Sequence, residues 1–364
     1  MTEPHLMYGA EFSLYSGKLR SYLRKKGIPF SEKTATAWVY KRVIVPRTGV
    51  RYIPVLRTPD GEYLQDTTAI IDTLEARFPA CPAYPEGPRQ RLAALLLELL
   101  GDEWLLLPAM HYRWHYRENH SFIYQQFGAM LFPWLPRFLQ GRIGKRVGAR
   151  FKNIVPRLGI TERTRPLLEH RYLSLLDGLQ QHFTQMPYLL GQRPSIGDYG
   201  LIGPFYAHLY RDPYPGRLMR ERAPAAAQWV ERMQSPKPAA GDLIADDVIP
   251  PTLIPILAQL CSDFLPIMLR LAGSVAEWAR QHAGEELPRI LGDAEFRLDE
   301  VVERRIQFPY SLWMFQRPWD AYRHASAAEK LLLQAFATQI NAREALEFDL
   351  PVRVMRRKNR LFVE

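Results

Sequence analysis

The pattern of apolar and polar positions changes character once along the chain, near residue 85. Before that point, short apolar runs of strand length alternate with helical repeats and turn residues. From about Arg89 the strand signals stop, and long leucine-rich stretches with helical spacing take over. The pattern therefore predicts a small domain of strands and helices followed by an all-helical part.

The first thirty residues predict a strand, a helix and a second strand. Residues 6–10 form a short apolar run, and residues 16–27 repeat apolar positions at helical spacing before a glycine stop. Residues 28–30 open the next extended segment. A unit of this length predicts a parallel strand pair with a right-handed crossover. Four basic residues of the helix are expected to be mostly solvent-exposed: Lys18, Arg20, Arg24 and Lys25.

The next forty residues predict a hairpin and a helix. Residues 52–56 and 62–64 flank Pro59-Asp60-Gly61, a strong turn signal, so they are expected to pair antiparallel. Asp66 or Thr67 then caps a helix with apolar residues at helical spacing. The predicted order of elements is βαβ followed by ββα.

The helical part contains one specific string and two long additions. Residues 92–107 predict a leucine-rich helix, and residues 188–198 read YLLGQRPSIGD. In that string Ser195 and Asp198 have the spacing of a capping box that starts a buried helix. An insertion at about residues 111–166 separates the helix from the string. A further extension covers residues 236–364.

Composition narrows the class of protein. The chain has 364 residues, 47% hydrophobic and 24% charged, as in ordinary soluble proteins. Its two cysteines provide neither a disulfide framework nor a four-cysteine zinc site. Its first residues also lack a secretory pattern. A cytoplasmic location is therefore expected. Residues 249–273 are apolar but are interrupted by Pro255 and Pro266 and carry Asp263 and Arg270. They favour a buried or interfacial helix pair over a membrane span.

The net charge of +10 raises the possibility of nucleic-acid binding. The basic residues are scattered along the chain, however, and no zinc-finger spacing, RNA-binding signature or basic zipper occurs. A basic surface that attracts small anions is the favoured interpretation, and nucleic acid is disfavoured as a partner.

Four separated motifs, in this order, resemble the glutathione transferase superfamily. They are Ser13-Leu14-Tyr15-Ser16, Ile53-Pro54, Asp66-Thr67 and the string at residues 188–198. The resemblance implies a thioredoxin-like glutathione-binding domain at residues 1–85 and an all-helical domain at residues 89–235. The extension at residues 236–364 is expected to be mostly helical and packed on the helical domain. The family also implies a two-fold homodimer.

The resemblance assigns chemistry to the loop before the first helix. Glutathione reacts as a thiolate, and a hydroxyl donor at a helix N-terminus favours that anion. Serine-type members use the first serine of this loop, which corresponds to Ser13, with Tyr15, Ser16 and Tyr8 as rivals. An ordinary capping role is favoured for Ser16. The loop has no cysteine, so conjugation or a glutathione-dependent lyase or isomerase step is expected instead of disulfide exchange.

The other motifs imply contacts with the rest of glutathione. Ile53-Pro54 matches the cis-proline motif whose backbone pairs with the cysteinyl part of glutathione. Asp66-Thr67 matches the acidic-serine pair that holds the γ-glutamyl end at a helix N-terminus. Candidates for the glycyl carboxylate, which the sequence does not rank, are Trp38, Lys41, Arg42 and Arg51.

In the family, the segment that corresponds to residues 111–120 (HYRWHYRENH) borders the second-substrate pocket. Aromatic residues there and nearby make an apolar pocket wall plausible, with plain core packing as an equal alternative, and Arg113 could attract an anionic substrate. His111, His115 and Glu118 also have helical spacing, but they lack the HExxH order, so no metal is expected. The proposed pocket residues are Trp104, Tyr112, Trp114 and Tyr116, with Arg113.

The leading hypothesis is thus a glutathione S-transferase that directs the thiolate at a hydrophobic, electrophilic small molecule, as in detoxification. The alternative is a non-catalytic binding or scaffold protein on the same fold, because fold alone does not determine function. The insertion and extension favour that alternative to some degree, since they could cover the usual pocket or form a new interface.

Overall fold

The computed structural model describes residues 3–364, and the contacts among them group the chain into two units. Unit 1 comprises the chain up to Ala83, Pro108–Val155 and Leu201–Ala240. Unit 2 comprises Tyr84–Leu107, Pro156–Gly200 and Gly241–Glu364. The units group spatial contacts and are not sequence domains, so the boundaries at residues 85, 89 and 235 stay a prediction.

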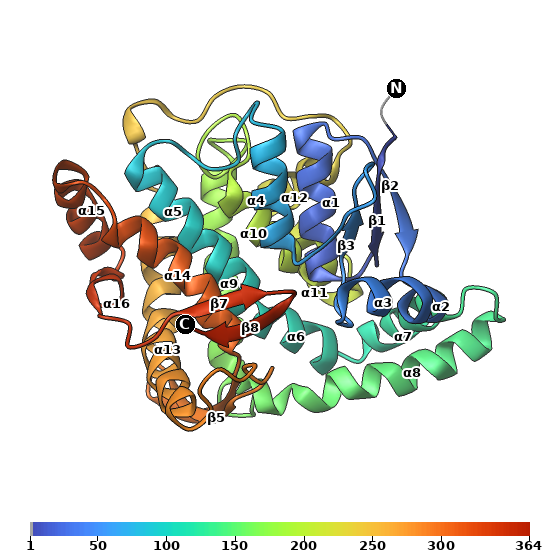
Figure 1. Ribbon diagram of the computed structural model, residues 1–364. Helices are drawn as coiled ribbons and strands as arrows, with labels where there is room; N and C mark the ends of the chain where they lie inside the picture. Colours follow the sequence, from blue (N-terminus) through green and yellow to red (C-terminus); the bar gives the residue numbers. More distant parts are fainter. Residues whose placement is uncertain (1–2) are drawn as a thin grey trace. The chain divides into compact units, whose positions relative to one another are not determined.

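Unit 1 contains a four-stranded mixed sheet with strand order β2-β1-β3-β4. Strand β1 runs parallel to β2 and antiparallel to β3, which pairs antiparallel with β4. Helices α1 and α4 lie together on one face of the sheet (Figure 1). The thioredoxin-like arrangement expected from the sequence is confirmed. Its elements are β1 His5–Gly9, α1 Leu14–Lys26, β2 Phe30–Thr34, β3 Val55–Arg57, β4 Tyr63–Gln65 and α4 Thr67–Arg77.

The prediction that the basic residues of α1 are mostly exposed is wrong. Lys18, Arg20 and Lys25 are buried, because α1 packs not only on the sheet but also against α4 and α12 (Pro224–Gln234). Each buried charge has polar partners. Arg20 donates two hydrogen bonds to the Glu32 carboxylate, at 2.7 and 2.6 Å. A helix covered on several sides cannot leave its charged face in water, and burial is tolerated only with such partners.

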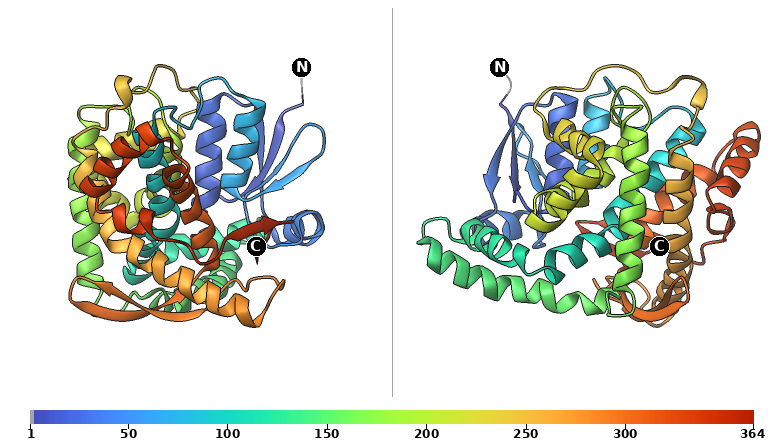
Figure 2. Two further views of the ribbon diagram at one scale, coloured as in Figure 1. Left: turned by 60° about the vertical axis from the view of Figure 1, so that its left-hand side comes forward. Right: turned by 180° about the vertical axis from the view of Figure 1, so that it is seen from behind.

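The remaining elements of unit 1 are helical. Helices α7 and α8 form an antiparallel hairpin inside the predicted insertion (Figures 1 and 2). The segment after β2 combines two short helices with a π-helical turn at Tyr40–Ile44. Helices α6 and α10 contain residues of both units. The bounds are α2 Ala37–Val39, α3 Val45–Thr48, α6 Leu106–His115, α7 Glu118–Leu131, α8 Arg137–Ile154, α10 Ile196–Pro204 and α11 Pro213–Arg222.

Unit 2 is built around helices α5, α9, α13 and α14. The C-terminal extension is not purely helical, because two antiparallel hairpins, β5–β6 and β7–β8, accompany its helices. Within unit 2, α14 and α15 of the extension pack on α5, and α13 packs on α9. The bounds are α5 Pro88–Leu99, α9 Arg165–Phe183, α13 Leu253–Gln281, β5 Gly292–Leu298, β6 Val301–Gln307, α14 Pro309–Arg323, α15 Ala327–Gln339, α16 Arg343–Glu347, β7 Val354–Arg357 and β8 Arg360–Val363.

Helix α13 has the length and composition of a membrane span, but it packs as a core helix of unit 2. Half of its most apolar window is buried. Its Asp263 is buried and accepts hydrogen bonds from Arg171 and Gln259, both at 3.2 Å. The sequence predicted a helix pair here, and that prediction is wrong, because the helix continues through Pro266.

The string at residues 188–198 starts helix α10 as expected. Asp198 accepts hydrogen bonds from the backbone N–H of Ser195 at 2.9 Å, from the Ser195 hydroxyl at 3.1 Å and from the backbone N–H of Leu189 at 3.1 Å. All three groups are buried, so the carboxylate satisfies donors that the fold removes from water. Its role is structural.

Lys25 gives unit 1 a pH-dependent stability. Its ammonium donates to Ser235 Oγ at 2.9 Å and to the Lys237 carbonyl at 3.0 Å, both uncharged acceptors. Burial, followed by the nearby Arg232, Arg24 and Lys237 charges, lowers the pKa of Lys25 to about 8. The folded state thus releases this proton before the unfolded state does, so this contribution to stability rises with pH between about 8 and 10.5.

We predict that Lys25→Met removes this rise. The free energy of unfolding of the wild type relative to the variant should increase by about 1–2 kcal/mol from pH 8 to pH 10.5. Urea unfolding at several pH values measures the difference. A difference that stays constant with pH would contradict the assignment.

Candidate functional site

Ser13 is the N-cap of helix α1, at the end of the loop that follows β1. Its backbone is extended (φ −87°, ψ 128°), and its hydroxyl oxygen accepts a hydrogen bond from the backbone N–H of Ser16 at 3.3 Å. That bond uses a lone pair of the oxygen and leaves the O–H hydrogen to donate elsewhere. The side chain is partly exposed at the positive end of a 13-residue helix. An anion placed there would meet both a hydroxyl donor and the helix dipole.

The other hydroxyls of this region are placed differently. The sequence favoured Ser16 as the helix cap, which is wrong, because α1 begins at Leu14 and Ser13 caps it. Ser16 is fully buried, and its oxygen accepts from the backbone N–H of Ala10 at 3.2 Å. Tyr15 is partly exposed on the first turn of α1.

The rival Tyr8 lies in the core on strand β1. Its ring stacks on Tyr63 and packs with Val39 and Val55. Burial, followed by the neighbouring Tyr63, raises the pKa of the Tyr8 hydroxyl. Of the four hydroxyls weighed from the sequence, Ser13 is the one that combines partial exposure with a helix N-cap position.

Two buried arginines hold the loop in front of Ser13. Arg20 Nη2 donates to the carbonyl of Ala10 at 3.5 Å, and Arg113 Nη1 donates to the carbonyl of Phe12 at 3.3 Å. Both guanidinium groups are anchored by carboxylates, Glu32 for Arg20 and Asp212 for Arg113. The backbone that carries Ser13 is therefore fixed from two sides.

The second glutathione motif lies at the start of the β3–β4 hairpin. The Ile53–Pro54 peptide bond is cis, as the family resemblance implies. Pro54 is buried and Ile53 partly exposed, directly before strand β3 begins at Val55.

The third motif forms the N-terminus of α4. Asp66 is the N-cap, and its carboxylate accepts from the backbone N–H of Ala69 at 3.0 Å. Its φ of 81° lies in a region that non-glycine residues rarely adopt, and such strain is found mainly at functional sites. Thr67 is buried at the first helical position. Beneath this end of the helix, the buried Lys18 ammonium donates to Thr68 Oγ1 at 3.2 Å.

The candidates for the glycyl carboxylate are exposed on one basic segment. Trp38 is 56% exposed, and Lys41, Arg42 and Arg51 are also exposed. No acidic residue occurs between Glu32 and Asp60, so the whole segment presents positive charge. The structure does not bring one of these side chains to a single defined anion position.

The predicted pocket residues fall into different settings. Tyr116 is partly exposed and stacks on Tyr214, with ring centroids 3.6 Å apart, and Tyr112 stacks on Tyr116 at 5.5 Å. Trp114 is buried in unit 1 and stacks on Phe127. Trp104 belongs to unit 2, where it is buried against Phe264 and Arg305.

Arg113 is not placed to meet a substrate anion. It is only 2% exposed, and its guanidinium donates to both oxygens of Asp212, at 2.7 and 2.8 Å. Its Nη2 also donates to the Ala207 carbonyl at 2.7 Å. The sequence missed this role, because Asp212 lies 99 positions away and no local pattern connects the two residues.

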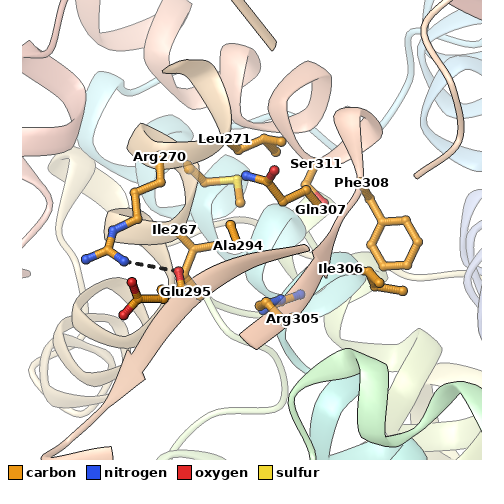
Figure 3. A pocket seen from close by; sticks show the side chains of 11 residues that line it. Ile267, Arg270, Leu271, Ala294, Glu295, Arg305, Ile306, Gln307, Phe308 and Ser311 are labelled. Carbon is orange, nitrogen blue, oxygen red and sulfur yellow. Dashed lines mark hydrogen bonds between the residues drawn. The ribbon is translucent and has the colours of Figure 1, made fainter. Parts of the chain in front are cut away.

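A cavity in unit 2 is too small for a substrate. It lies between α13, the β5–β6 hairpin and α14, and Figure 3 shows Arg270, Arg305 and Gln307 around it. Its volume is about 10 Å³, room for about one water molecule. Burial lowers the pKa of Arg305 to about 10, with Glu103 opposing the shift. This cavity is a packing feature of the extension.

A larger, open groove of about 450 Å³ lies in unit 1 at the C-terminal end of α1. It is lined by residues such as Arg24, Phe30 and Pro238, at the opposite end of the helix from Ser13.

The two possible metal ligands His111 and His115 stack on each other, with ring centroids 5.0 Å apart. Within residues 3–364, no group of three or more His, Cys, Asp or Glu side chains is arranged to hold a metal ion.

Comparison with known proteins identifies the N-terminal domain. Residues 7–87 match the family profile described as "Glutathione S-transferase, N-terminal domain". The resemblance seen in the sequence motifs is therefore confirmed for this part of the chain. No curated protein matches the sequence.

Several solved structures match about two thirds of this chain at low sequence identity. A glutathione S-transferase from Methylobacterium radiotolerans, in complex with glutathione sulfonate, is 22% identical over 68% of this chain and 100% of its own, with a TM-score of 0.39. One from Sinorhizobium meliloti is 22% identical over 70% and 93% of the two chains, with a TM-score of 0.39. A glutathione transferase from Phanerochaete chrysosporium is 16% identical over 67% and 100%, with a TM-score of 0.45.

We predict that Asp212→Ala destabilises the protein by about 3–5 kcal/mol, because it leaves the buried Arg113 charge without its counterion. Replacing both partners, in Arg113→Leu with Asp212→Leu, should cost distinctly less, since no unpaired charge then remains buried. Urea unfolding measures both. Equal losses for the single and double variants would show that the charge is not the cause.

Proposed function

The chain carries the N-terminal domain of the glutathione S-transferases, and from this premise we propose that the protein is a glutathione-dependent transferase. The observation that carries the proposal is the position of Ser13, a helix N-cap whose O–H hydrogen is not used by its capping bond. The match at residues 7–87 includes this serine and both other glutathione motifs of the domain.

The proposed chemistry begins with the thiol of glutathione beside Ser13. A free thiol has a pKa of about 8.5, so at neutral pH most of it is protonated. A hydrogen bond from Ser13 Oγ and the positive end of α1 stabilise the thiolate and release the proton to solvent. The sulfur then forms a bond to an electrophilic carbon, and a leaving group departs with the bonding electrons in a substitution.

The rest of glutathione would lie along the other two motifs. The γ-glutamyl carboxylate would meet the N-terminus of α4, and its ammonium would meet Asp66. The backbone of Ile53, before Pro54, would pair with the cysteinyl part. The glycyl carboxylate would contact the basic segment that holds Lys41 and Arg51. These assignments rest on the family motifs and on the positions of the residues in unit 1.

The second substrate would be a hydrophobic electrophile. The partly exposed Tyr116, backed by Tyr112 and Tyr214, offers aromatic surface within unit 1. Since Ser13-Leu14-Tyr15-Ser16 has no cysteine, conjugation, elimination or isomerisation is proposed and disulfide exchange is not. The proposed protein is also a two-fold homodimer that acts in a reducing compartment.

We predict that the protein binds glutathione with micromolar to low-millimolar affinity, and S-hexylglutathione more tightly, because the hexyl chain removes apolar surface from water. Isothermal titration calorimetry measures both. If neither ligand binds, the fold has been kept without glutathione, and a scaffold function replaces the proposed one.

We predict that Ser13→Ala lowers turnover with an electrophilic aryl halide about 100-fold, and that Ser13→Thr retains most of it, since threonine keeps the hydroxyl and the cap. The ultraviolet absorbance of bound thiolate should titrate at higher pH in Ser13→Ala. Ser16→Ala is the matched control and should leave that titration unchanged. An unchanged titration in Ser13→Ala would move the role to Tyr15.

A further inference from the structure

The α7–α8 hairpin is held together by glycines on one face of α8. A Cβ atom on Gly144 would lie 1.7 Å from the Tyr124 carbonyl oxygen, and one on Gly148 would lie 3.0 Å from the Trp114 ring. On α7, a Cβ on Gly128 would meet the Gln140 carbonyl at 1.9 Å. The two helices thus touch through their backbones. The inner face of α8 is fixed, and the opposite face is free of contacts that would bury it.

That opposite face is strongly basic. Phe138, Arg142, Lys145 and Arg146 follow one another at spacings of four, three and one, which places them on one side of a helix. All of the basic side chains of α8 are exposed, and none forms an ion pair with a described residue. The sequence has no acidic residue between Glu118 and Glu162. The six cations are Arg137, Arg142, Lys145, Arg146, Arg150 and Lys152.

Large apolar side chains accompany these charges at the turn between the helices. Trp134 is 62% exposed and Phe138 is 64% exposed, among the most exposed large apolar residues described. They belong to the run Leu131-Phe-Pro-Trp-Leu-Pro-Arg-Phe-Leu139, whose three leucines are only partly buried. The turn lies at the outer end of the hairpin (Figure 2).

We propose that this face of α8, with its turn, docks on the surface of an anionic phospholipid bilayer. Each exposed Lys or Arg near such a surface is attracted to the negative headgroups, and Trp and Phe insert at the boundary with the acyl chains. Nucleic acid would also attract the cations. The leucines of the turn favour lipid, because aliphatic side chains do not stack on bases, whereas they partition into a bilayer.

Docking does not depend on glutathione chemistry. The face and its turn lie entirely within residues 131–152, and the glutathione motifs lie within residues 13–67. Loss of glutathione binding would therefore leave the docking intact, and the two proposals can fail separately. The long apolar helix α13 belongs to unit 2, whereas this surface belongs to unit 1.

The test is co-sedimentation of the full-length protein with vesicles of phosphatidylcholine alone or with 30% phosphatidylglycerol (about one anionic lipid in three). We expect binding to the anionic vesicles that weakens as salt is raised. The triple variant Arg142→Gln, Lys145→Gln, Arg146→Gln should bind about 10- to 100-fold more weakly. Trp134→Ser with Phe138→Ser should also weaken binding.

The matched control removes the same charge from a different basic cluster, with Arg357→Gln, Lys358→Gln and Arg360→Gln in the C-terminal hairpin. It should bind vesicles as the wild type does, and circular dichroism should show that all variants are folded. Equal losses in both triple variants would overturn the proposal, since net charge alone would then explain binding. Absence of vesicle binding, or binding to a DNA duplex that outcompetes the vesicles, would also overturn it.

Discussion

The candidate site depends on the burial of charge around the loop that joins β1 to α1. Arg20 and Arg113 each donate to a carboxylate and also to a backbone carbonyl of this loop. The Arg113–Asp212 pair is fully buried, and breaking such a pair costs about 3–5 kcal/mol. The Arg20 guanidinium is also buried, while its partner Glu32 is partly in contact with solvent. The loop that carries Ser13 is in this way held by side chains that lie outside the loop.

A residue of the same loop also packs against the inserted α7–α8 hairpin. Phe12, next to Ser13, packs edge-on against Phe127 of α7 at 4.7 Å, and Phe127 stacks on Phe151 of α8 at 5.1 Å. The insertion is therefore part of the core behind the candidate site as well as a carrier of exposed charge. The hairpin can both pack behind the site and expose positive charge, because its glycine-packed inner face and its basic outer face lie on different sides of α8.

Much of the N-terminal domain could be read from local signals. Three of these signals influence only the few residues beside them in the chain. They are the turn residues at 59–61, the glycine that ends α1 (φ 70° at Gly27) and the capping carboxylate of Asp66. The sequence could not reveal that Lys18, Arg20 and Lys25 are buried. Amphipathic periodicity shows one apolar face but not whether another helix will cover the polar one.

The sequence by itself determined the order of strands and helices in the N-terminal domain, the family of that domain and the positions of the motifs that resemble glutathione-binding ones, because each depends on short-range spacing. Only the tertiary structure decided that Ser13, and not Ser16, caps α1, that Arg113 binds Asp212 instead of facing a substrate, and that α13 continues through Pro266. Each of these outcomes depends on which side chains and backbone segments the fold buries against one another. Partners such as Arg113 and Asp212 are far apart in the chain, and only the fold brings them into contact.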